Sequence, residues 1–241
     1  MTAVTAAPAR HLRTAPAVLS CRGLRHGFDG HVVVDDVSFD VRAGEVYGLV
    51  GPAGSGKSTT VRLVCGLLEP DDGGVLLGGR PMAHLDRADL RRSVGYVAQS
   101  VVTLPSVTVA ETAALRARFL GLTRAECADR TAEALAAVGL ARWAEHRVDR
   151  CSGGVLRELS LAVTLLARPR LLVLDEPGAG IDQASRDRLI DTLGRLCDGG
   201  TAVLYATRHV DEADRLGARV GVLGADRPVA RHQHHVHAPV A

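Results

Sequence analysis

The chain has 241 residues, a length that suits one domain or one core carrying an inserted subdomain. Hydrophobic residues make up 46% and charged residues 23% of the sequence, the balance of an ordinary soluble globular protein. The formal net charge of only +2, with arginines scattered among acids, argues against a nucleic-acid partner. No stretch approaches the roughly 20 apolar residues that span a bilayer. The five cysteines form no CxxC pair and are predicted to be reduced thiols of a cytoplasmic protein.

The first 77 residues show mainly strand patterns. Residues 1–17 are rich in Ala, Thr and Pro and are predicted to be a disordered leader. Asp29 and Gly30 lie between two β-rich segments and predict a hairpin turn. The strands expected here cover residues 18–24, 31–41, 45–50 and 75–77, and one helix is expected over residues 57–68.

The sequence changes character at about residue 101. Up to residue 150 it is rich in Ala, Arg, Glu and Leu at helical spacing, and two S/T-x-x-E capping boxes mark helix starts, Thr108 with Glu111 and Thr123 with Glu126. Beyond this region, short apolar runs predict buried parallel strands with a helix between them. These elements cover residues 171–174, 183–196 and 202–205. The pattern predicts a β-rich start, an α/β core and a helical insertion inside it.

The last segment, residues 231–241, carries four histidines: His232, His234, His235 and His237. Their spacing fits no defined metal site. We therefore expect a disordered tail.

Residues 51–58 satisfy the phosphate-binding pattern G-x-x-x-x-G-K-[ST]. Glycines let the backbone curl so that N–H groups point at phosphate oxygens, and the following helix adds the positive end of its dipole. Lys57 brings a full charge to the β- and γ-phosphates, and Ser58 offers a hydroxyl to Mg²⁺. The sequence thus predicts a P-loop nucleoside triphosphatase core that binds ATP with Mg²⁺. The expected contact residues are Gly51, Pro52, Ala53, Gly54, Ser55, Gly56, Lys57, Ser58 and Thr59.

Two acids end the apolar run at residues 171–174. Asp175 is expected on the metal side of the phosphates, and Glu176 is expected to act as general base on a water near the γ-phosphate. Because strands often end in acids, the pattern is informative only together with the phosphate loop.

Ser152, Gly153 and Gly154 precede a helical run that begins near Val155. Their N–H groups and the helix dipole would form a second anion site, and the plainer alternative is a helix-capping turn. One chain does not need two phosphate sites for one nucleotide. Two chains that face each other would, because each would complete the nucleotide site of the other.

The order of these motifs, together with Gln99 and Asp182, resembles the nucleotide-binding subunits of ATP-binding-cassette (ABC) transporters. The resemblance covers about residues 18–230, with a helical insertion over about 101–158. It implies an α/β fold: a P-loop nucleoside triphosphatase core with an antiparallel β subdomain and an inserted helical subdomain. It also implies an ATPase that pairs with a second ABC ATPase chain and drives a polytopic membrane permease from the inner face of the cell membrane.

Three segments look like the drug- and antibiotic-exporting branch of this family. They are VGYVAQ at 94–99, PSVTV at 105–109 and VDEAD at 210–214. The resemblance therefore implies export of a drug-like or antibiotic molecule. The substrate, the direction of transport and the choice between homodimer and heterodimer cannot be derived from these motifs.

The resemblance also assigns roles to single residues. Gln99 would sense the γ-phosphate through Mg²⁺ or the attacking water, so it is a candidate for both catalysis and metal binding. Asp182 lies where the D-loop of the family crosses the dimer interface. His26 stands near the position of the aromatic ring that stacks on adenine, with Phe28 close by, and either ring could stack.

The sequence departs from the family in the signature and in the switch histidine as well. Cys151 and Val155 replace the flanks of the signature sequence. Arg208 stands where the family places the histidine that holds the γ-phosphate, and His209 follows one residue later. A one-residue shift at a strand end turns a side chain to the opposite face, so His209 is not expected to substitute. Arg208 can hold a phosphate oxygen but cannot relay a proton, so we expect slow hydrolysis or dependence on a partner residue.

Two other interpretations stay open. A degenerate ABC-type regulator would bind ATP and dimerise with little hydrolysis, which Arg208 favours and the intact Lys57 and Glu176 oppose. A cassette ATPase of translation or DNA repair would carry two cassettes or a long coiled-coil insertion, and the sequence has neither.

Overall fold

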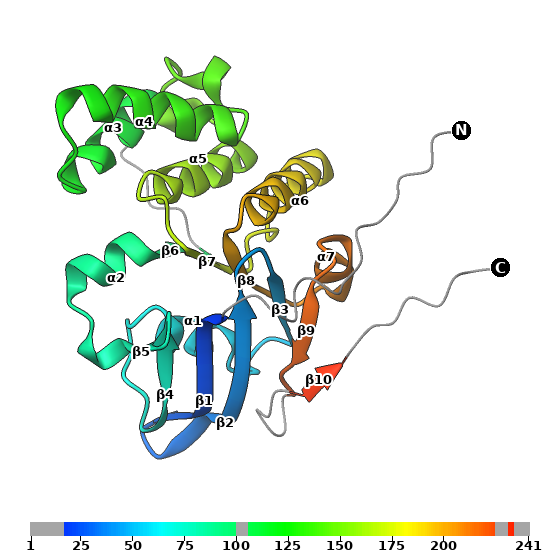
Figure 1. Ribbon diagram of the computed structural model, residues 1–241. Helices are drawn as coiled ribbons and strands as arrows, with labels where there is room; N and C mark the ends of the chain where they lie inside the picture. Colours follow the sequence, from blue (N-terminus) through cyan, green and yellow to red (C-terminus); the bar gives the residue numbers. More distant parts are fainter. Residues whose placement is uncertain (1–16, 100–105, 225–230, 234–241) are drawn as a thin grey trace.

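A computed structural model describes residues 17–99, 106–224 and 231–233. It confirms the predicted fold class, with one antiparallel sheet, one mainly parallel sheet and a separate group of helices (Figure 1). The predicted leader lies outside the described residues except for Ala17, which opens the first strand.

The antiparallel sheet has the strand order β2-β1-β4-β5. Asp29 has φ 49° and Gly30 has φ 81°, so the predicted hairpin turn between β1 and β2 has the left-handed pair of a type I′ turn. The strands are β1 (Ala17–Phe28), β2 (His31–Arg42), β4 (Asp72–Leu77) and β5 (Arg80–Pro81).

The second sheet has the order β10-β9-β3-β8-β7-β6, and all its pairings are parallel except that of β10 with β9. Every residue of β3, β7 and β8 is buried, because both faces of the sheet are covered. This explains their unbroken apolar runs. The strands are β3 (Val46–Val50), β6 (Val94–Val97), β7 (Leu171–Asp175), β8 (Ala202–Thr207), β9 (Arg219–Val222) and β10 (Arg231–Gln233).

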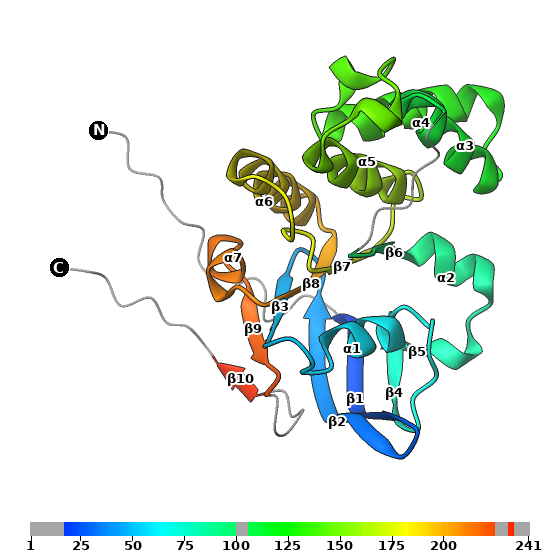
Figure 2. The ribbon, with the colours of Figure 1, turned by 180° about the vertical axis from the view of Figure 1, so that it is seen from behind.

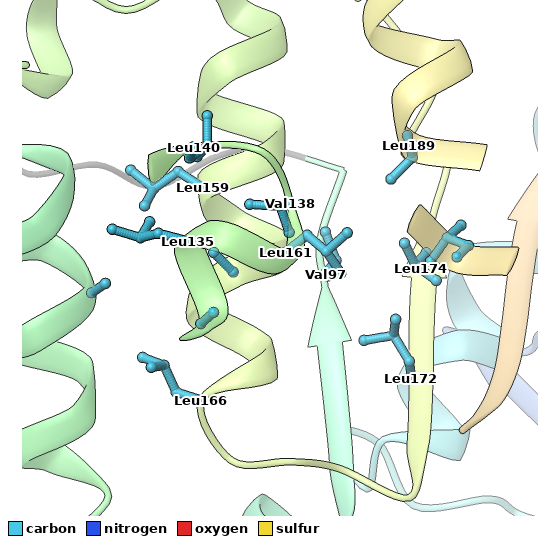
Figure 3. Close-up of a cluster of buried hydrophobic side chains, with 14 of the residues drawn as sticks. Val97, Leu135, Val138, Leu140, Leu159, Leu161, Leu166, Leu172, Leu174 and Leu189 are labelled. Carbon is cyan, nitrogen blue, oxygen red and sulfur yellow. The ribbon is translucent and has the colours of Figure 1, made fainter. Parts of the chain in front are cut away.

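Alternate side chains of the parallel sheet enter two different cores. Leu171 and Val173 pack with α1 and the antiparallel sheet, whereas Leu172 and Leu174 pack with the helices on the other face. Figure 3 shows Leu172 and Leu174 beside Val97, with Leu135 and other leucines of the helices near them. The sheet is therefore fixed on both sides, and the loops at its carboxyl edge extend from a rigid base.

The helices α3, α4 and α5 form a subdomain on one side of the parallel sheet, with α5 in contact with β6 (Figure 2). Both predicted capping boxes are present, at the starts of α3 and α4. The helices are α1 (Lys57–Val64), α2 (Arg87–Ser93), α3 (Val109–Phe119), α4 (Arg124–Ala137), α5 (Gly153–Leu165), α6 (Gln183–Asp198) and α7 (Val210–Arg215). The 3-10 turns are η1 (Met82–His84), η2 (Ala141–Trp143) and η3 (Val148–Arg150).

The sequence pattern misses several elements. Helix α2 has no buried residue, so it has no apolar period to detect, and α7 is only six residues long. The expectation of a disordered tail is wrong for Arg231–Gln233, because this segment gains backbone pairing at the edge of β9. His234, His235 and His237 lie outside the described residues. Nowhere in the described part is a helix both long and apolar enough to cross a bilayer.

Candidate nucleotide site

The phosphate loop connects the end of β3 to the start of α1. Gly56 is the N-cap of α1 and has φ 87°, and a Cβ at this position would lie 2.5 Å from the carbonyl oxygen of Val33. Only glycine satisfies both requirements. No side chain caps α1, so its first N–H groups are left to bind an anion.

Lys57 is held at the loop by its own backbone. Its side chain is 3% exposed, and Nζ donates to the carbonyl oxygens of Gly51 and Pro52 at 2.8 Å each. Burial lowers the pKa of Lys57, and the nearby carboxylate of Glu176 opposes this shift. The result is a buried cation whose fixed position suits it to neutralise phosphate.

Ser58 and Asp175 bring two oxygen ligands together from different elements. Ser58 Oγ donates to Asp175 Oδ1 at 3.1 Å, across the contact between α1 and β7. Burial raises the pKa of Asp175, and the hydrogen bond from Ser58 opposes it. A hydroxyl and a buried carboxylate are hard oxygen ligands. A cation beside the carboxylate would stabilise its ionised form, which burial disfavours. The pair therefore fits Mg²⁺.

Glu176 directs its carboxylate into the same site from an unusual backbone conformation. Its φ is 45°, in the left-handed region that non-glycine residues seldom adopt, and its N–H donates to the carbonyl of Ala206 at 2.8 Å. One carboxylate oxygen lies 3.6 Å from Lys57 Nζ, and the other lies 3.0 Å from Arg208 Nε. The carboxylate thus sits between two cations.

These side chains surround a pocket of about 320 Å³, which we call the nucleotide pocket. It brings together the phosphate loop and three of the distant residues predicted from the sequence. Its lining consists of Val33, Ala53, Gly54, Gly56, Lys57, Ser58, Thr59, Gln99, Glu176 and Arg208. Arg208 lines it and His209 does not, as expected from the strand geometry. The backbone N–H of His209 instead donates to Thr207 Oγ1 at 3.0 Å.

The signature tripeptide, Ser152, Gly153 and Gly154, lies outside this pocket. Ser152 caps α5, where its Oγ accepts from the N–H of Val155 at 3.4 Å. Asp182 caps α6, since its carboxylate accepts from the N–H and the hydroxyl of Ser185. A Cβ on Gly154 would lie 2.2 Å from Ser185 Oγ, so the two helix starts pack closely in one chain.

His26 also lies outside the lining of the nucleotide pocket. Its side chain is 12% exposed, with Nδ1 at 3.5 Å from Asp71 and the ring edge-on to Phe28 at 4.7 Å. Phe28, at 44% exposed, is the more accessible ring. Sequence reasoning missed Val33, and it also missed Arg157, whose only signal is that it interrupts the apolar pattern of α5 together with Glu158.

A phosphate loop and a carboxylate pair at the end of another strand of the same parallel sheet define a P-loop nucleoside triphosphatase. The ABC transporter family model matches residues 34–179, more than half of the chain. The chain belongs to this family, as an ATP-binding subunit whose ATPase activity is coupled to transport.

Named relatives agree with this assignment. The chain is 32% identical to the linearmycin resistance ATP-binding protein LnrL of Bacillus subtilis, over 88% of this chain and 68% of that protein. It is 34% identical to the daunorubicin/doxorubicin resistance ATP-binding protein DrrA of Streptomyces peucetius, over 91% of this chain and 66% of that protein. The solved structure of CbiO1 of Clostridium perfringens, part of the ABC transporter complex CbiONQ, superposes with a TM-score of 0.82 at 25% identity. The match covers 90% of this chain and 87% of that chain. The chain spans about two thirds of the two relatives, and none of these similarities supports a degenerate regulator.

Proposed function

We propose that this chain hydrolyses ATP to power export of a drug-like or antibiotic molecule through a separate membrane permease. The observation that carries the proposal is the nucleotide pocket, in which Lys57, Ser58 and Glu176 converge around an uncapped helix start. The export direction is supported by the names of LnrL and DrrA, both resistance proteins.

The residues of the pocket divide the chemistry among them. Lys57 and the phosphate loop hold the β- and γ-phosphates, while Ser58, Asp175 and Gln99 hold Mg²⁺. Bound Mg²⁺ neutralises phosphate charge and orients the phosphates. Glu176 accepts the proton of the attacking water as general base.

Arg208 has a different task from a histidine. Its guanidinium carries a permanent charge and forked donors, so it binds a γ-phosphate oxygen well but transfers no proton. In the structure it is bound to Glu176, so nucleotide must draw it away before Glu176 can accept a proton. Slow turnover is expected because this exchange precedes hydrolysis and because arginine relays no proton.

Phe28 is the better candidate than His26 for stacking on adenine. It ends β1, opposite His31 of β2, and its ring is accessible, whereas His26 is mostly buried beside Asp71. A base stacked on an aromatic face gains roughly 1–3 kcal/mol.

A second ABC ATPase chain would complete each site. The signature tripeptide caps α5 away from the nucleotide pocket of its own chain, which supports a role for its N–H groups in binding the ATP of a partner. Two chains would then enclose two ATP molecules head to tail. The complex would lie at the cytoplasmic face of the membrane, held there by the permease.

The permease is proposed to dock in a groove of about 510 Å³, here the arginine groove. It lies between the core and the helical subdomain and combines apolar side chains, including Leu67 and Leu90, with Arg87, Arg91 and Arg116. Tyr96, on the strand that leads to Gln99, also lines it. The charge favours an acidic cytoplasmic segment of the permease as the partner.

Steady-state MgATP hydrolysis by the purified chain tests the proposal. Wild type should turn over, whereas Glu176→Gln should bind ATP with little hydrolysis, losing roughly 10²–10⁴ in rate. Lys57→Ala should lose binding as well. Equal rates for wild type and Glu176→Gln would reject the catalytic assignment.

Arg91→Glu tests the docking groove: it should leave basal hydrolysis intact but weaken association with the permease. Arg118→Glu, outside the groove, serves as control.

A further inference from the structure

Arg157 is a buried arginine on α5, the helix that begins with the signature tripeptide. Its side chain reaches the segment that follows β6. Nη1 donates to the carbonyl oxygen of Ala98 and Nη2 to that of Gln99, at 2.6 Å each. The residue is 5% exposed, so these two bonds form away from water.

The remaining contacts of Arg157 do not account for its charge. No carboxylate in the described residues forms an ion pair with it, and its Nε is buried without a hydrogen-bond partner there. Burial lowers the pKa of Arg157, as expected where the charged form lacks an anion. A buried charge is costly, and an apolar side chain would fill this space more favourably. The fork of donors, by contrast, matches two successive carbonyls, which a lysine cannot do.

The two ends of this contact belong to different nucleotide sites. Gln99 lines the nucleotide pocket of its own chain. The start of α5 carries Ser152, Gly153 and Gly154, proposed to face the nucleotide of the partner. Glu158, next to Arg157, binds Arg188 at 2.7 Å, and Arg188 also donates to Ser185 at the start of α6. Consecutive side chains of α5 thus connect it to the segment of Gln99 and to α6.

We propose that Arg157 is a positioning residue that couples the two nucleotide sites by making α5 follow the backbone of Gln99. When Gln99 engages MgATP, its carbonyl carries Arg157 and the signature tripeptide with it. ATP bound in the nucleotide pocket of this chain then changes the position of the signature tripeptide, which this chain contributes to the nucleotide site of its partner. This rests on the proposed two-chain arrangement.

Hydrogen–deuterium exchange of the full chain tests the coupling directly. The experiment uses Glu176→Gln, so that ATP persists, at protein concentrations too low for dimers. MgATP should change exchange at the start of α5 in this background. Arg157→Met should remove that change while nucleotide affinity stays within about twofold, and Arg157→Lys should restore part of it. Arg130→Met is the matched control, because Arg130 also donates from a helix to a backbone carbonyl, that of Leu166 at the far end of α5.

Hydrolysis supplies a second readout. Arg157→Met in the otherwise wild-type chain should lower the Hill coefficient for MgATP towards one and reduce kcat roughly 2- to 30-fold, the range for side chains that carry coupling between sites. A nucleotide response of α5 that survives Arg157→Met would overturn the proposal, and so would its absence from the Glu176→Gln background. If Arg157→Met does not fold, Arg157→Lys is compared with the parent chain; its response at the start of α5 should be reduced, because lysine cannot reach both carbonyls, and an unreduced response would overturn the proposal. A chain that binds no ATP would instead reject the proposed function itself.

Discussion

Arg208 Nε lies 3.0 Å from Glu176 Oε2, so the side chain at the family's histidine position is bound to the carboxylate that we assign as general base. The other oxygen of Glu176 lies 3.6 Å from Lys57 Nζ. Phosphate oxygens compete well for both cations, because charge-assisted bonds from lysine and arginine favour phosphate. Nucleotide binding is therefore expected to release Glu176 as it takes up Lys57 and Arg208.

Arg208→His should accelerate hydrolysis. Histidine removes the ion pair with Glu176 and adds a group that can exchange a proton, and such groups contribute roughly 10²–10⁴ in rate. Because the site evolved with arginine, we expect a smaller gain, up to roughly 10²-fold in kcat, measured by steady-state phosphate release.

Arg208→Gln separates the loss of the ion pair with Glu176 from the gain of a group that exchanges a proton. Glutamine removes the charge without supplying an acid or base, so its gain should be smaller than that of histidine. Turnover of Arg208→His that is unchanged or lower would contradict the assignment of Arg208 as the limit on rate. Any gain should also vanish when Glu176→Gln is added.

Much of the fold could be predicted because local pattern and burial agree. The runs of β7 and β8 are apolar throughout since both faces of the sheet are covered, and the capping boxes of Thr108 and Thr123 are purely local. Helix α2 has no buried residue, and Leu90 packs only partly against the core, so its clearest local signal is Asp86, whose carboxylate accepts from the N–H of Asp89. Strand β10 depends on pairing with β9, which no local pattern encodes.

The site shows the same division. The phosphate loop and the two acids at the end of β7, Asp175 and Glu176, are contiguous motifs, so the sequence predicts them. The contact of Arg157 with Gln99 joins residues far apart in the chain, and its partners are backbone carbonyls that exist at every position. The sequence leaves open whether His26 or Phe28 is the ring proposed to stack on adenine, because only the folded hairpin shows which one is exposed.

Gly154→Ala should destabilise the chain by about 1–3 kcal/mol, the usual cost of overpacking. Its Cβ would lie 2.2 Å from Ser185 Oγ and 2.9 Å from Ser185 Cβ, so the starts of α5 and α6 must separate. Urea unfolding measures the change. Ser185→Gly removes both obstructing atoms, so Gly154→Ala should cost less in that background than alone. Equal costs in the two backgrounds would show that the clash is not the cause.

The capping boxes of the helical subdomain give a local test. Thr123→Ala removes the acceptor for the N–H of Glu126 and should cost roughly 0.5–2 kcal/mol in the free energy of unfolding. Thr108→Ala should cost a similar amount for α3, and the two effects should add, because each cap satisfies only its own helix. Glu126→Gln preserves the box and is the control, with a change of a few tenths of a kcal/mol expected. A larger effect for Glu126→Gln than for Thr123→Ala would contradict this account of α4.

Asp175→Asn should raise the melting temperature of the nucleotide-free chain near neutral pH, while abolishing the effect of Mg²⁺ on ATP binding. Burial raises the pKa of Asp175 above its unfolded value, so the ionised carboxylate weakens folding at neutral pH. This penalty disappears as the pH falls through the raised pKa. The stabilisation by asparagine should therefore shrink on acidification and vanish towards about pH 3, below the unfolded pKa of about 3.9, where the carboxyl is mostly neutral in both states. About 1 kcal/mol corresponds to roughly 2–4 °C in a chain of this size, which scanning calorimetry resolves.

Asp149→Asn is the matched control of opposite sign. Its hydrogen bond and ion pair with Arg147 lower the pKa of Asp149, so the ionised form favours folding above its unfolded pKa. Asparagine there should lower the melting temperature near neutral pH, by a small amount because the pair is at the surface, and the difference should fade in acid. If Asp175→Asn instead destabilised the nucleotide-free chain at neutral pH, Asp175 would be held by its bond to Ser58 more than it is penalised by burial. The site would then be stable without a cation, and the basis for placing Mg²⁺ there would fail.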